Sequence, residues 1–179
     1  MNLPPLVWDA CSLLNLLSTG RALEVVSSMN RECYVPEWVL QNEVLYLRPL
    51  ERDAAQELLL ADPQPLLGAG LLKPIALLPE EMALYVAFAA QMDDGEAQCL
   101  AVAANRRYHL MTDDRVAIRE ALRCLPPIRT GQTPEWLREW LEATPMVHPR
   151  EIVQRVTVSA RFRPPRNSVH LTWWLSLLE

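Results

Sequence analysis

The stretch from Leu6 to Leu17 reads LVWDACSLLNLL and contains two kinds of periodicity, separated by one acidic residue. Leu6-Val7-Trp8 is a short apolar run typical of a buried strand, and residues 11–17 have the apolar spacing of a helix. Asp9 lies between them, where the strand ends and the helix begins. A strand that passes so quickly into a helix indicates a β-α unit of a parallel sheet.

The rest of the chain repeats this alternation. Further strands are predicted at residues 33–35, 71–76, 108–111 and 128–129, and residues 62–78 otherwise read as a loop because of their prolines and glycines. Helices are predicted at residues 21–29, 37–47, 51–60, 79–91, 96–106, 115–123 and 149–160, and from residue 133 onward with Thr133 as N-cap. This order predicts an α/β fold with a central parallel sheet flanked by helices. Neither a G-x-G-x-x-G nor a P-loop motif is present, so nucleotide binding of those kinds is not supported.

Composition and charge favour one globular domain with a distinct end. The chain has 179 residues, of which 50% are apolar and 22% charged, and its net charge of −5 excludes a basic nucleic-acid coat. Residues 147–179 carry five arginines and two glutamates, a net charge of +3. We therefore predict two parts: residues 1–144 as the main domain, and residues 145–179 as a basic, Trp-containing C-terminal extension with helical and extended segments.

Cysteine usage and hydropathy predict a cytoplasmic protein. The four cysteines (Cys11, Cys33, Cys99 and Cys124) show no C-x-x-C spacing and are predicted to be buried, reduced core residues. The N-terminus lacks the basic region of a signal peptide, and no apolar stretch is long enough to span a membrane.

Acidic residues recur where predicted strands end or helices begin. Asp9 and the pair Asp113-Asp114 each follow a strand, and the carboxyl ends of parallel strands share the edge of the sheet where ligands bind. Asp93, Asp94 and Glu96 lie at another loop-to-helix junction, and Glu43 is predicted inside a helix, on or beside its apolar face. Singly, each Asp is also explained as a helix N-cap or turn residue, and Glu43 as a solvated helix residue.

Together, these carboxylates point to a metal site. Several carboxylates at one edge repel one another unless a cation neutralises them, and oxygen ligands without His or Cys suit Mg²⁺ or Mn²⁺. Such ions can activate water for phosphodiester hydrolysis. The pattern therefore predicts a metal-dependent nuclease chemistry.

Four blocks in this order resemble the PIN-domain family, in the branch that holds VapC-like toxin ribonucleases and GEA-type relatives. The blocks are VWDACSLLNL at residues 7–16, YVP at residues 34–36 with Val39 and Glu43-Val44, DDGEA at residues 93–97 with Leu100-Ala101, and LMTDDR at residues 110–115 with Ala117. The resemblance covers about residues 5–130.

The resemblance implies a Rossmann-like PIN domain that cleaves single-stranded or structured RNA through an acidic pocket binding Mg²⁺ or Mn²⁺. Carried over by position, the catalytic acids and metal ligands are Asp9, Glu43, Glu96 and Asp113, with Asp93 and Asp114 as further metal ligands. Thr112 would orient the fourth acid or a water. The implied partners are RNA, an antitoxin protein and a second copy of the chain.

Two features depart from the family pattern. Cys11 stands where the family has a small hydroxyl residue, with Ser12 following it, and the extension has no family assignment. A PIN-fold binding scaffold with weak or no nuclease activity, or a metal-dependent phosphatase, are the alternatives. A small antitoxin-like reading frame beside the gene would favour the toxin hypothesis.

Arginines and aromatics near these blocks have two interpretations each. Arg106, Arg107, Arg115, Arg119 and Arg123 either receive phosphates or form solvated helix faces with neighbours such as Glu120. The aromatics of the extension (Phe162, Trp173 and Trp174) either stack on bases or pack the extension onto its own domain. Residues 161–166 contain Pro164-Pro165 and are predicted to run extended over a surface, docking on acidic groups.

Overall fold

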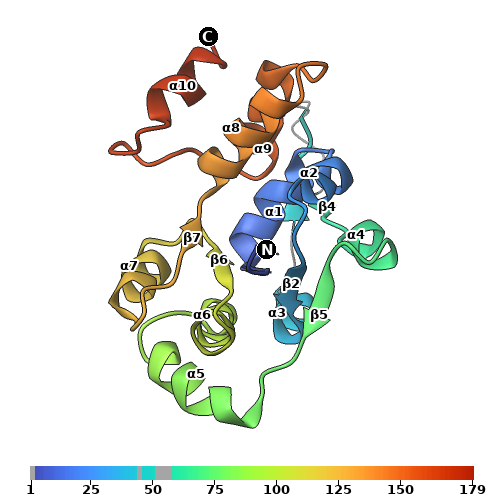
Figure 1. The fold of residues 1–179 in the computed structure, drawn as a ribbon. Helices are drawn as coiled ribbons and strands as arrows, with labels where there is room; N and C mark the ends of the chain where they lie inside the picture. Colours follow the sequence, from blue (N-terminus) through green and yellow to red (C-terminus); the bar gives the residue numbers. More distant parts are fainter. Residues whose placement is uncertain (1–2, 44–45, 51–57) are drawn as a thin grey trace.

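A five-stranded parallel sheet forms the centre of the protein (Figure 1). This computed structural model describes residues 3–43, 46–50 and 58–179. The sheet has the order β5-β2-β1-β6-β7, and its strands are β1 (Leu6–Trp8), β2 (Cys33–Pro36), β5 (Lys73–Ile75), β6 (His109–Met111) and β7 (Thr130–Gly131). All four pairings are parallel. The predicted α/β class, with a central parallel sheet flanked by helices, is confirmed.

Strand β1 is buried on both faces and separates two apolar cores. Because side chains alternate along a strand, Leu6 and Trp8 point into one core and Val7 into the other. The first core is covered by α1 (Ala10–Ser18), α2 (Ala22–Ser28), α8 (Thr133–Ala143) and α9 (Pro149–Ser159). The second is covered by α6 (Asp94–Arg106) and α7 (Arg115–Arg123). Burial on both faces explains why β1 reads as a continuous apolar run.

Shorter elements complete the fold. They are α3 (Glu37–Asn42), β3 (Tyr46–Leu47), β4 (Leu59–Leu60), α4 (Gln64–Gly68), the 3-10 helix η1 (Pro79–Glu81), α5 (Met82–Ala89) and α10 (Leu171–Ser176). Among the helices of the described residues, none has the length and apolar character needed to cross a membrane.

The predicted helix at residues 37–47 is too long, and Glu43 does not lie inside it. Helix α3 ends at Asn42, and Glu43 takes an extended conformation with φ −99° and ψ 99°. The helix does not continue because Tyr46 and Leu47 pair with β4 in an antiparallel ladder. The predicted helix at residues 51–60 is also wrong at its end, where β4 is a strand, and its residues 51–57 lie outside the described residues.

Three smaller predictions also need correction. Residues 64–68 were predicted to be part of a loop but form helix α4. The helix tolerates Pro65 because this residue lies in the first turn, where a missing N–H costs no hydrogen bond. The strand predicted at residues 128–129 lies at Thr130–Gly131, beside β6. The N-cap of α8 is Gln132 rather than Thr133, because Thr133 directs both its N–H and its hydroxyl to Asp113.

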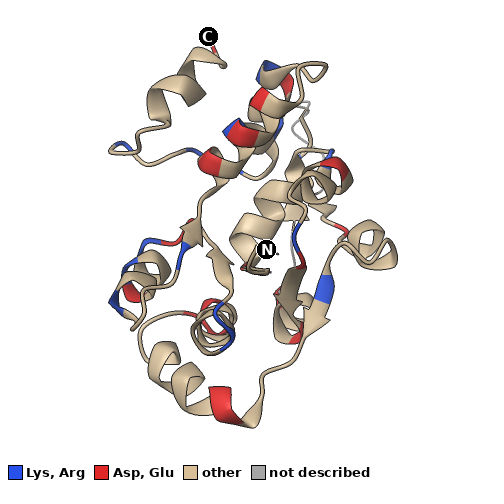
Figure 2. Cartoon of the chain, viewed as in Figure 1, with Lys and Arg blue, Asp and Glu red and all other residues tan. Residues whose placement is uncertain are grey.

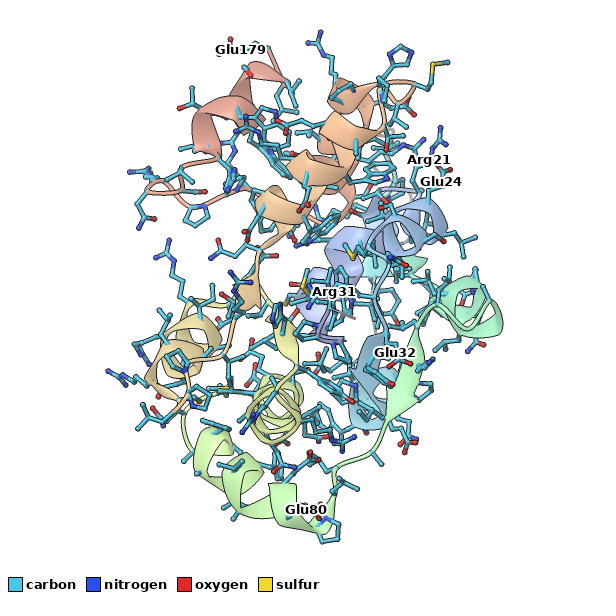
Figure 3. The ribbon with its side chains drawn as sticks, viewed as in Figure 1. Arg21, Glu24, Arg31, Glu32, Glu80 and Glu179 are labelled. Carbon is cyan, nitrogen blue, oxygen red and sulfur yellow. The ribbon has the colours of Figure 1, made fainter. Side chains whose placement is uncertain are left out.

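Ion pairs on this scaffold differ in their environment. The Glu81 side chain is fully buried and accepts hydrogen bonds from Arg106 Nε at 2.6 Å and from Asn105 Nδ2 at 3.2 Å. This contact ties η1 to the end of α6. The Arg21–Glu24 pair, labelled in Figure 3, lies on the surface of α2 with both side chains about half exposed. Such a surface pair contributes little to stability.

The C-terminal extension packs on the main domain through apolar side chains. Val153, Val156 and Trp174 are fully buried in the same core as Leu13 of α1. The Trp174 ring meets Phe162 edge-on at 5.4 Å, and its Nε1 donates to Thr157 Oγ1 at 3.0 Å. Residues 161–165, between α9 and α10, are not helical. The docking contact is therefore an apolar core rather than the acidic surface expected from the extension's charge.

Candidate functional site

The predicted acids gather at the point where the order of strands reverses. The chain runs from β1 to β2 and β5 on one side, then returns to place β6 on the other side of β1. In open parallel sheets, ligands bind at the carboxyl ends of the strands beside such a reversal. Asp9 follows β1, and its N–H donates to the Met111 carbonyl at the end of β6 at 3.1 Å. Asp113 follows β6 after one intervening residue, Thr112.

An acidic pocket of about 380 Å³ opens at this edge. Carboxylates from three separate segments line it: Asp9 after β1, Glu43 after α3, and the group Asp93, Asp94 and Glu96 at the start of α6. The sequence-predicted residues Asp9, Glu43, Asp93 and Glu96 are thus brought together. Asp94, which was not among the predicted ligands, lines the same pocket.

Asp9 is the most deeply placed carboxylate of this pocket. Only 1% of it is exposed, and its Oδ1 caps helix α1 by accepting from the Ser12 N–H at 2.6 Å. Its Oδ2 is buried and has no hydrogen-bond partner within the described ranges. Burial raises the pKa of Asp9 to about 7, and the Asp113 charge adds to this, while the neighbouring polar groups of Thr112 and Ser12 act in the opposite direction. Capping of helix α1 uses only the Oδ1 oxygen of Asp9, so it does not account for the buried and unpartnered Oδ2.

Glu43 lies directly against the first turn of α6. A Cβ atom on Gly95 would come within 1.8 Å of Glu43 Oε1, so the absence of a side chain there lets the carboxylate reach the helix backbone. Burial raises the pKa of Glu43, as do the charges of Asp93 and Asp94. The pKa of Glu96 is raised to about 7 by burial and by the charges of Asp114, Asp9 and Asp93.

Gly95→Ala should therefore displace the Glu43 carboxylate from the pocket. We expect metal binding by the protein, measured by titration calorimetry with Mn²⁺, to weaken about tenfold, the loss of roughly 1.4 kcal/mol. The flexible end of Glu43 can move aside, so the melting temperature should change by only a few degrees, roughly 1 kcal/mol.

The matched control is Gly68→Ala in helix α4. A Cβ atom on Gly68 would meet no described atom within 4 Å, so this variant should bind Mn²⁺ like the wild type and gain about 0.4–1 kcal/mol of stability. Equal Mn²⁺ affinity in Gly95→Ala and Gly68→Ala would contradict a role of Glu43 in metal binding at this pocket.

Asp113 lies beside the pocket and is held in a hydrogen-bond network. Its carboxylate accepts from the Thr133 N–H at 2.9 Å, from the Thr133 hydroxyl, from Asn15 Nδ2 at 3.1 Å and from Ser12 Oγ at 3.4 Å. Burial raises its pKa, and these hydrogen bonds oppose the shift. Ser12 therefore links Asp9, through its N–H, to Asp113, through its hydroxyl.

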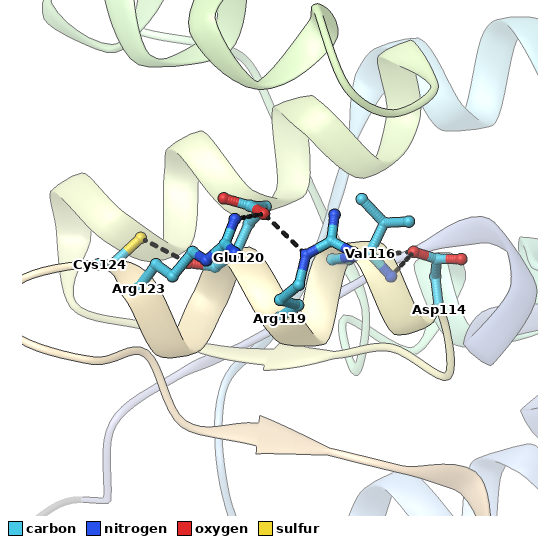
Figure 4. A network of polar contacts seen from close by, with 7 residues as sticks. Asp114, Val116, Arg119, Glu120, Arg123 and Cys124 are labelled. Atoms are coloured by element: carbon cyan, nitrogen blue, oxygen red, sulfur yellow. Dashed lines mark hydrogen bonds and ion pairs between the residues drawn. The ribbon is translucent and has the colours of Figure 1, made fainter.

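Asp114 has a structural role that the sequence also allowed. Its Oδ1 caps α7 by accepting from the Val116 N–H at 2.7 Å and from the Ala117 N–H at 2.8 Å (Figure 4). The Asp114 N–H in turn donates to Thr112 Oγ1 at 3.1 Å. Asp114 does not line the acidic pocket, although its charge contributes to the raised pKa of Glu96.

Sequence reasoning missed the residues that hold Asp113. Asn15 lies three residues after Ser12 on the face of α1 that begins at Asp9, and this spacing could have revealed it. Thr133 gave no such signal, because it comes from twenty residues further along the chain.

Cys11 was predicted to be buried in the core but is exposed and lines the acidic pocket. Partial desolvation raises the pKa of its thiol to about 12, and the surrounding carboxylate charges add to this effect. Cys11 is therefore a neutral thiol at neutral pH, which is a poor ligand for Mg²⁺ or Mn²⁺. The hydroxyl of the next residue, Ser12, donates to Asp113 at 3.4 Å.

The acidic pocket has the oxygen ligands that a divalent cation prefers, but these ligands are not already arranged around one ion position. In the described part of the chain, no three His, Cys, Asp or Glu side chains already enclose a point where an ion would sit. The buried Asp9 Oδ2 lacks a partner among these described residues, and the raised pKa values of Asp9, Glu43 and Glu96 mean that ionising these close carboxyl groups is unfavourable without a compensating cation. A hard cation is the partner that compensates such a set of oxygen ligands.

Several arginines singled out above already have protein partners. Arg106 pairs with the buried Glu81, and Arg119 and Arg123 both contact Glu120 Oε1, at 3.1 and 2.8 Å (Figure 4). For these residues the helix-face interpretation is at least partly correct. Among the described residues Arg115 has no ion-pair partner.

Comparisons with protein-family models, with curated proteins and with solved structures find no match to this chain. The resemblance to the PIN-domain family therefore rests on the four sequence blocks.

Proposed function

We propose that this protein is a metal-dependent ribonuclease of the PIN-domain type. The observation that carries the proposal is the acidic pocket itself: carboxylates from three separate segments meet at the reversal point of the sheet, around a buried Asp9 with one unpartnered oxygen. Like charges in a partly desolvated pocket repel one another, so this arrangement destabilises the ligand-free fold. A ligand that compensates the charges gives a reason for the arrangement.

The chemistry follows from the residues that line the pocket. Asp9, Glu43, Asp93 and Glu96 would hold Mg²⁺ or Mn²⁺, with Asp94 beside them, and the bound ion would supply a Lewis acid and an activated water for phosphodiester hydrolysis. Ser12 holds Asp9 and Asp113 in fixed orientations, since it contacts both. Thr112 is fully buried, and its hydroxyl oxygen accepts from the Asp114 N–H, which fixes the backbone that follows Asp113.

Metal removal is the direct test. The purified protein should cleave single-stranded RNA with Mg²⁺ or Mn²⁺, lose the activity by orders of magnitude in EDTA, and regain it when metal is added in excess. Cleavage is followed by gel electrophoresis of an end-labelled RNA. Activity that persists in EDTA would rule out the metal-dependent mechanism.

A PIN-fold scaffold without nuclease activity is the second candidate. It is favoured by Asp113, whose two oxygens are both occupied by hydrogen bonds from Thr133, Asn15 and Ser12. RNA bound without cleavage in the same assay would support the scaffold. A metal-dependent phosphatase would instead hydrolyse a phosphomonoester such as p-nitrophenyl phosphate.

The partners implied by the family resemblance are part of this proposal. A homodimer is supported by α5, which is strongly apolar although none of its eight residues is buried. An antitoxin is expected from a neighbouring reading frame, and co-expression with it should suppress both cleavage and growth inhibition.

A further inference from the structure

A second and larger hollow is lined in part by Asp113. This groove has a volume of about 780 Å³ and runs between α7, the start of α8 and the loop at residues 162–170 of the C-terminal extension. Figure 1 shows α7 and the loop before α10 on the same side of the molecule, separated by the strand β7 and the start of α8. Asp113 lines this groove, and the buried Ser12 connects it to Asp9 of the acidic pocket.

The extension forms a firmly anchored wall of this groove. The Phe162 N–H donates to the Val156 carbonyl at 3.3 Å, and the Ser168 N–H donates to the Pro165 carbonyl at 2.9 Å. Pro164 is buried, and Phe162 packs edge-on against the buried Trp174 at 5.4 Å. Arg163 stands between these anchors, is exposed, and lines the groove.

Positive charge comes from both sides of the groove. Arg115 and Arg119 of α7 and Arg163 of the extension line the groove. Figure 2 shows Lys and Arg positions in blue on both elements. Arg119 shares the buried Glu120 with Arg123. Neither Arg115 nor Arg163 has an ion-pair partner in the residues that the structure describes.

The two acidic residues that line the groove, Asp113 and Glu135, accept hydrogen bonds from other parts of the protein. Asp113 is satisfied by Thr133, Asn15 and Ser12. Glu135 turns toward the start of its own helix, where its Oε2 accepts from the Gln132 N–H at 3.5 Å. Neither carboxylate forms an ion pair with Arg115 or Arg163 among the described residues, so both guanidinium groups can contact an anion in the groove.

We propose that this groove binds the sugar–phosphate backbone of single-stranded RNA beside Asp113, and that the C-terminal extension supplies one of its walls. Arg115 and Arg163 would contact phosphates from opposite sides, since guanidinium groups bind phosphate oxygens in pairs. The apolar side chains of Leu122 and Val169, 63% and 88% exposed, offer surfaces for bases. This inference rests on the proposed ribonuclease function, because it assigns the path by which the strand reaches the acidic pocket.

An RNA strand fits the groove better than an acidic protein segment. Asp113 lines the groove and is joined through Ser12 to Asp9 of the acidic pocket, so a strand bound in the groove would lie near the proposed site of cleavage. A protein segment would gain nothing from this continuity. The body of the protein is otherwise acidic, with the extension carrying a net charge of +3, so phosphate contacts are expected to concentrate here.

The test compares two double variants that remove the same charge. Arg115→Gln with Arg163→Gln alters the groove, whereas Arg150→Gln with Arg161→Gln removes two exposed arginines of the extension that do not line it. Binding of a fluorescent oligouridylate of about twelve nucleotides is measured by anisotropy across a salt series, in EDTA so that no cleavage occurs. Cleavage with Mg²⁺ is measured separately.

The double variant Arg115→Gln, Arg163→Gln should weaken RNA binding about tenfold or more. It should also reduce the slope of log K against log salt concentration by about 1.4, at roughly 0.7 for each lost phosphate contact. The control pair should leave both unchanged. Equal effects of the two pairs, or none from either, would overturn the proposal, as would an acidic peptide that binds through Arg115 and Arg163 as tightly as the RNA. Groove-dependent binding without any cleavage would keep this inference and reject the ribonuclease function; cleavage with groove-independent binding would do the reverse.

Discussion

Asp9→Asn is expected to abolish RNA cleavage while raising the melting temperature of the metal-free protein. Asparagine keeps the shape of the side chain and the oxygen that accepts from the Ser12 N–H, so helix α1 remains capped. It removes the buried negative charge that the proposed metal ion requires. Activity should fall by orders of magnitude, measured as initial cleavage rate at saturating Mg²⁺.

The gain in stability follows from the raised pKa of Asp9. An acid with a pKa of 3.8 when unfolded and about 7 when folded binds its proton more tightly in the folded state. The metal-free protein is therefore stabilised at low pH and loses stability as the pH rises from about 4 to 7, by up to roughly 4 kcal/mol from this group. In Asp9→Asn this loss should disappear, giving a melting temperature about 5 °C or more above wild type near pH 8.

The matched control is Asp62→Asn, an exposed aspartate that accepts from the Gln64 N–H at 2.9 Å and lies outside the pocket. It should keep wild-type cleavage and the wild-type pH dependence of melting. Full activity in Asp9→Asn would reject the nuclease proposal. An Asp9→Asn protein that melts with the same pH dependence as wild type would instead show that Asp9 is not the group held in its protonated form.

The sequence predicted the core of the fold because strong local patterns coincide there with burial. Strand β1 is apolar at every position and buried on both faces, and it leads to Asp9 and the capped helix α1 without a loop. Asp113 and Asp114 come shortly after β6, which pairs in parallel with β1, so the sequence correctly placed them at the same edge of the sheet as Asp9. Local signals were sufficient because each of these acids lies within three residues of the end of its strand.

Predictions failed where distant contacts decide the conformation. Glu43 was placed inside a helix because the apolar period continues past Asn42, whereas pairing of β3 with β4 redirects the chain after that residue. Cys11 was read as core because it is apolar in character, yet it follows the carboxyl edge of the sheet and faces the pocket. The contact between Thr133 and Asp113 joins segments twenty residues apart, and no spacing rule anticipates it.

The extension offered two readings of its tryptophans, and the structure separates them. Trp174 is fully buried in the core shared with α1, whereas Trp173 is only partly buried and faces Arg138 at 5.7 Å. The packing interpretation therefore holds for Trp174. Residues on both sides of the predicted boundary at 144 contribute to this one core, including Leu141 and Val147.

Trp174→Ala should consequently cause a large loss of stability. Removing a buried indole leaves a cavity and the unpaired Thr157 hydroxyl, at a cost of about 3–5 kcal/mol, which lowers the melting temperature by roughly 10 °C or more. Trp174→Phe keeps most of the ring contact with Phe162 and loses mainly the hydrogen bond, so its loss should be about 1–2 kcal/mol.

Trp173→Ala is the control, since it makes the same change one residue earlier at a partly exposed site, and it should cost about 1 kcal/mol or less. Truncation after Thr144 removes Val153, Val156 and Trp174 together, and the shortened chain should not show a cooperative thermal transition by circular dichroism. A truncated chain that melts like the wild type would mean that α1 and α8 close their core without the extension. In that case equal losses in Trp173→Ala and Trp174→Ala should also be seen, because neither indole would then support the fold.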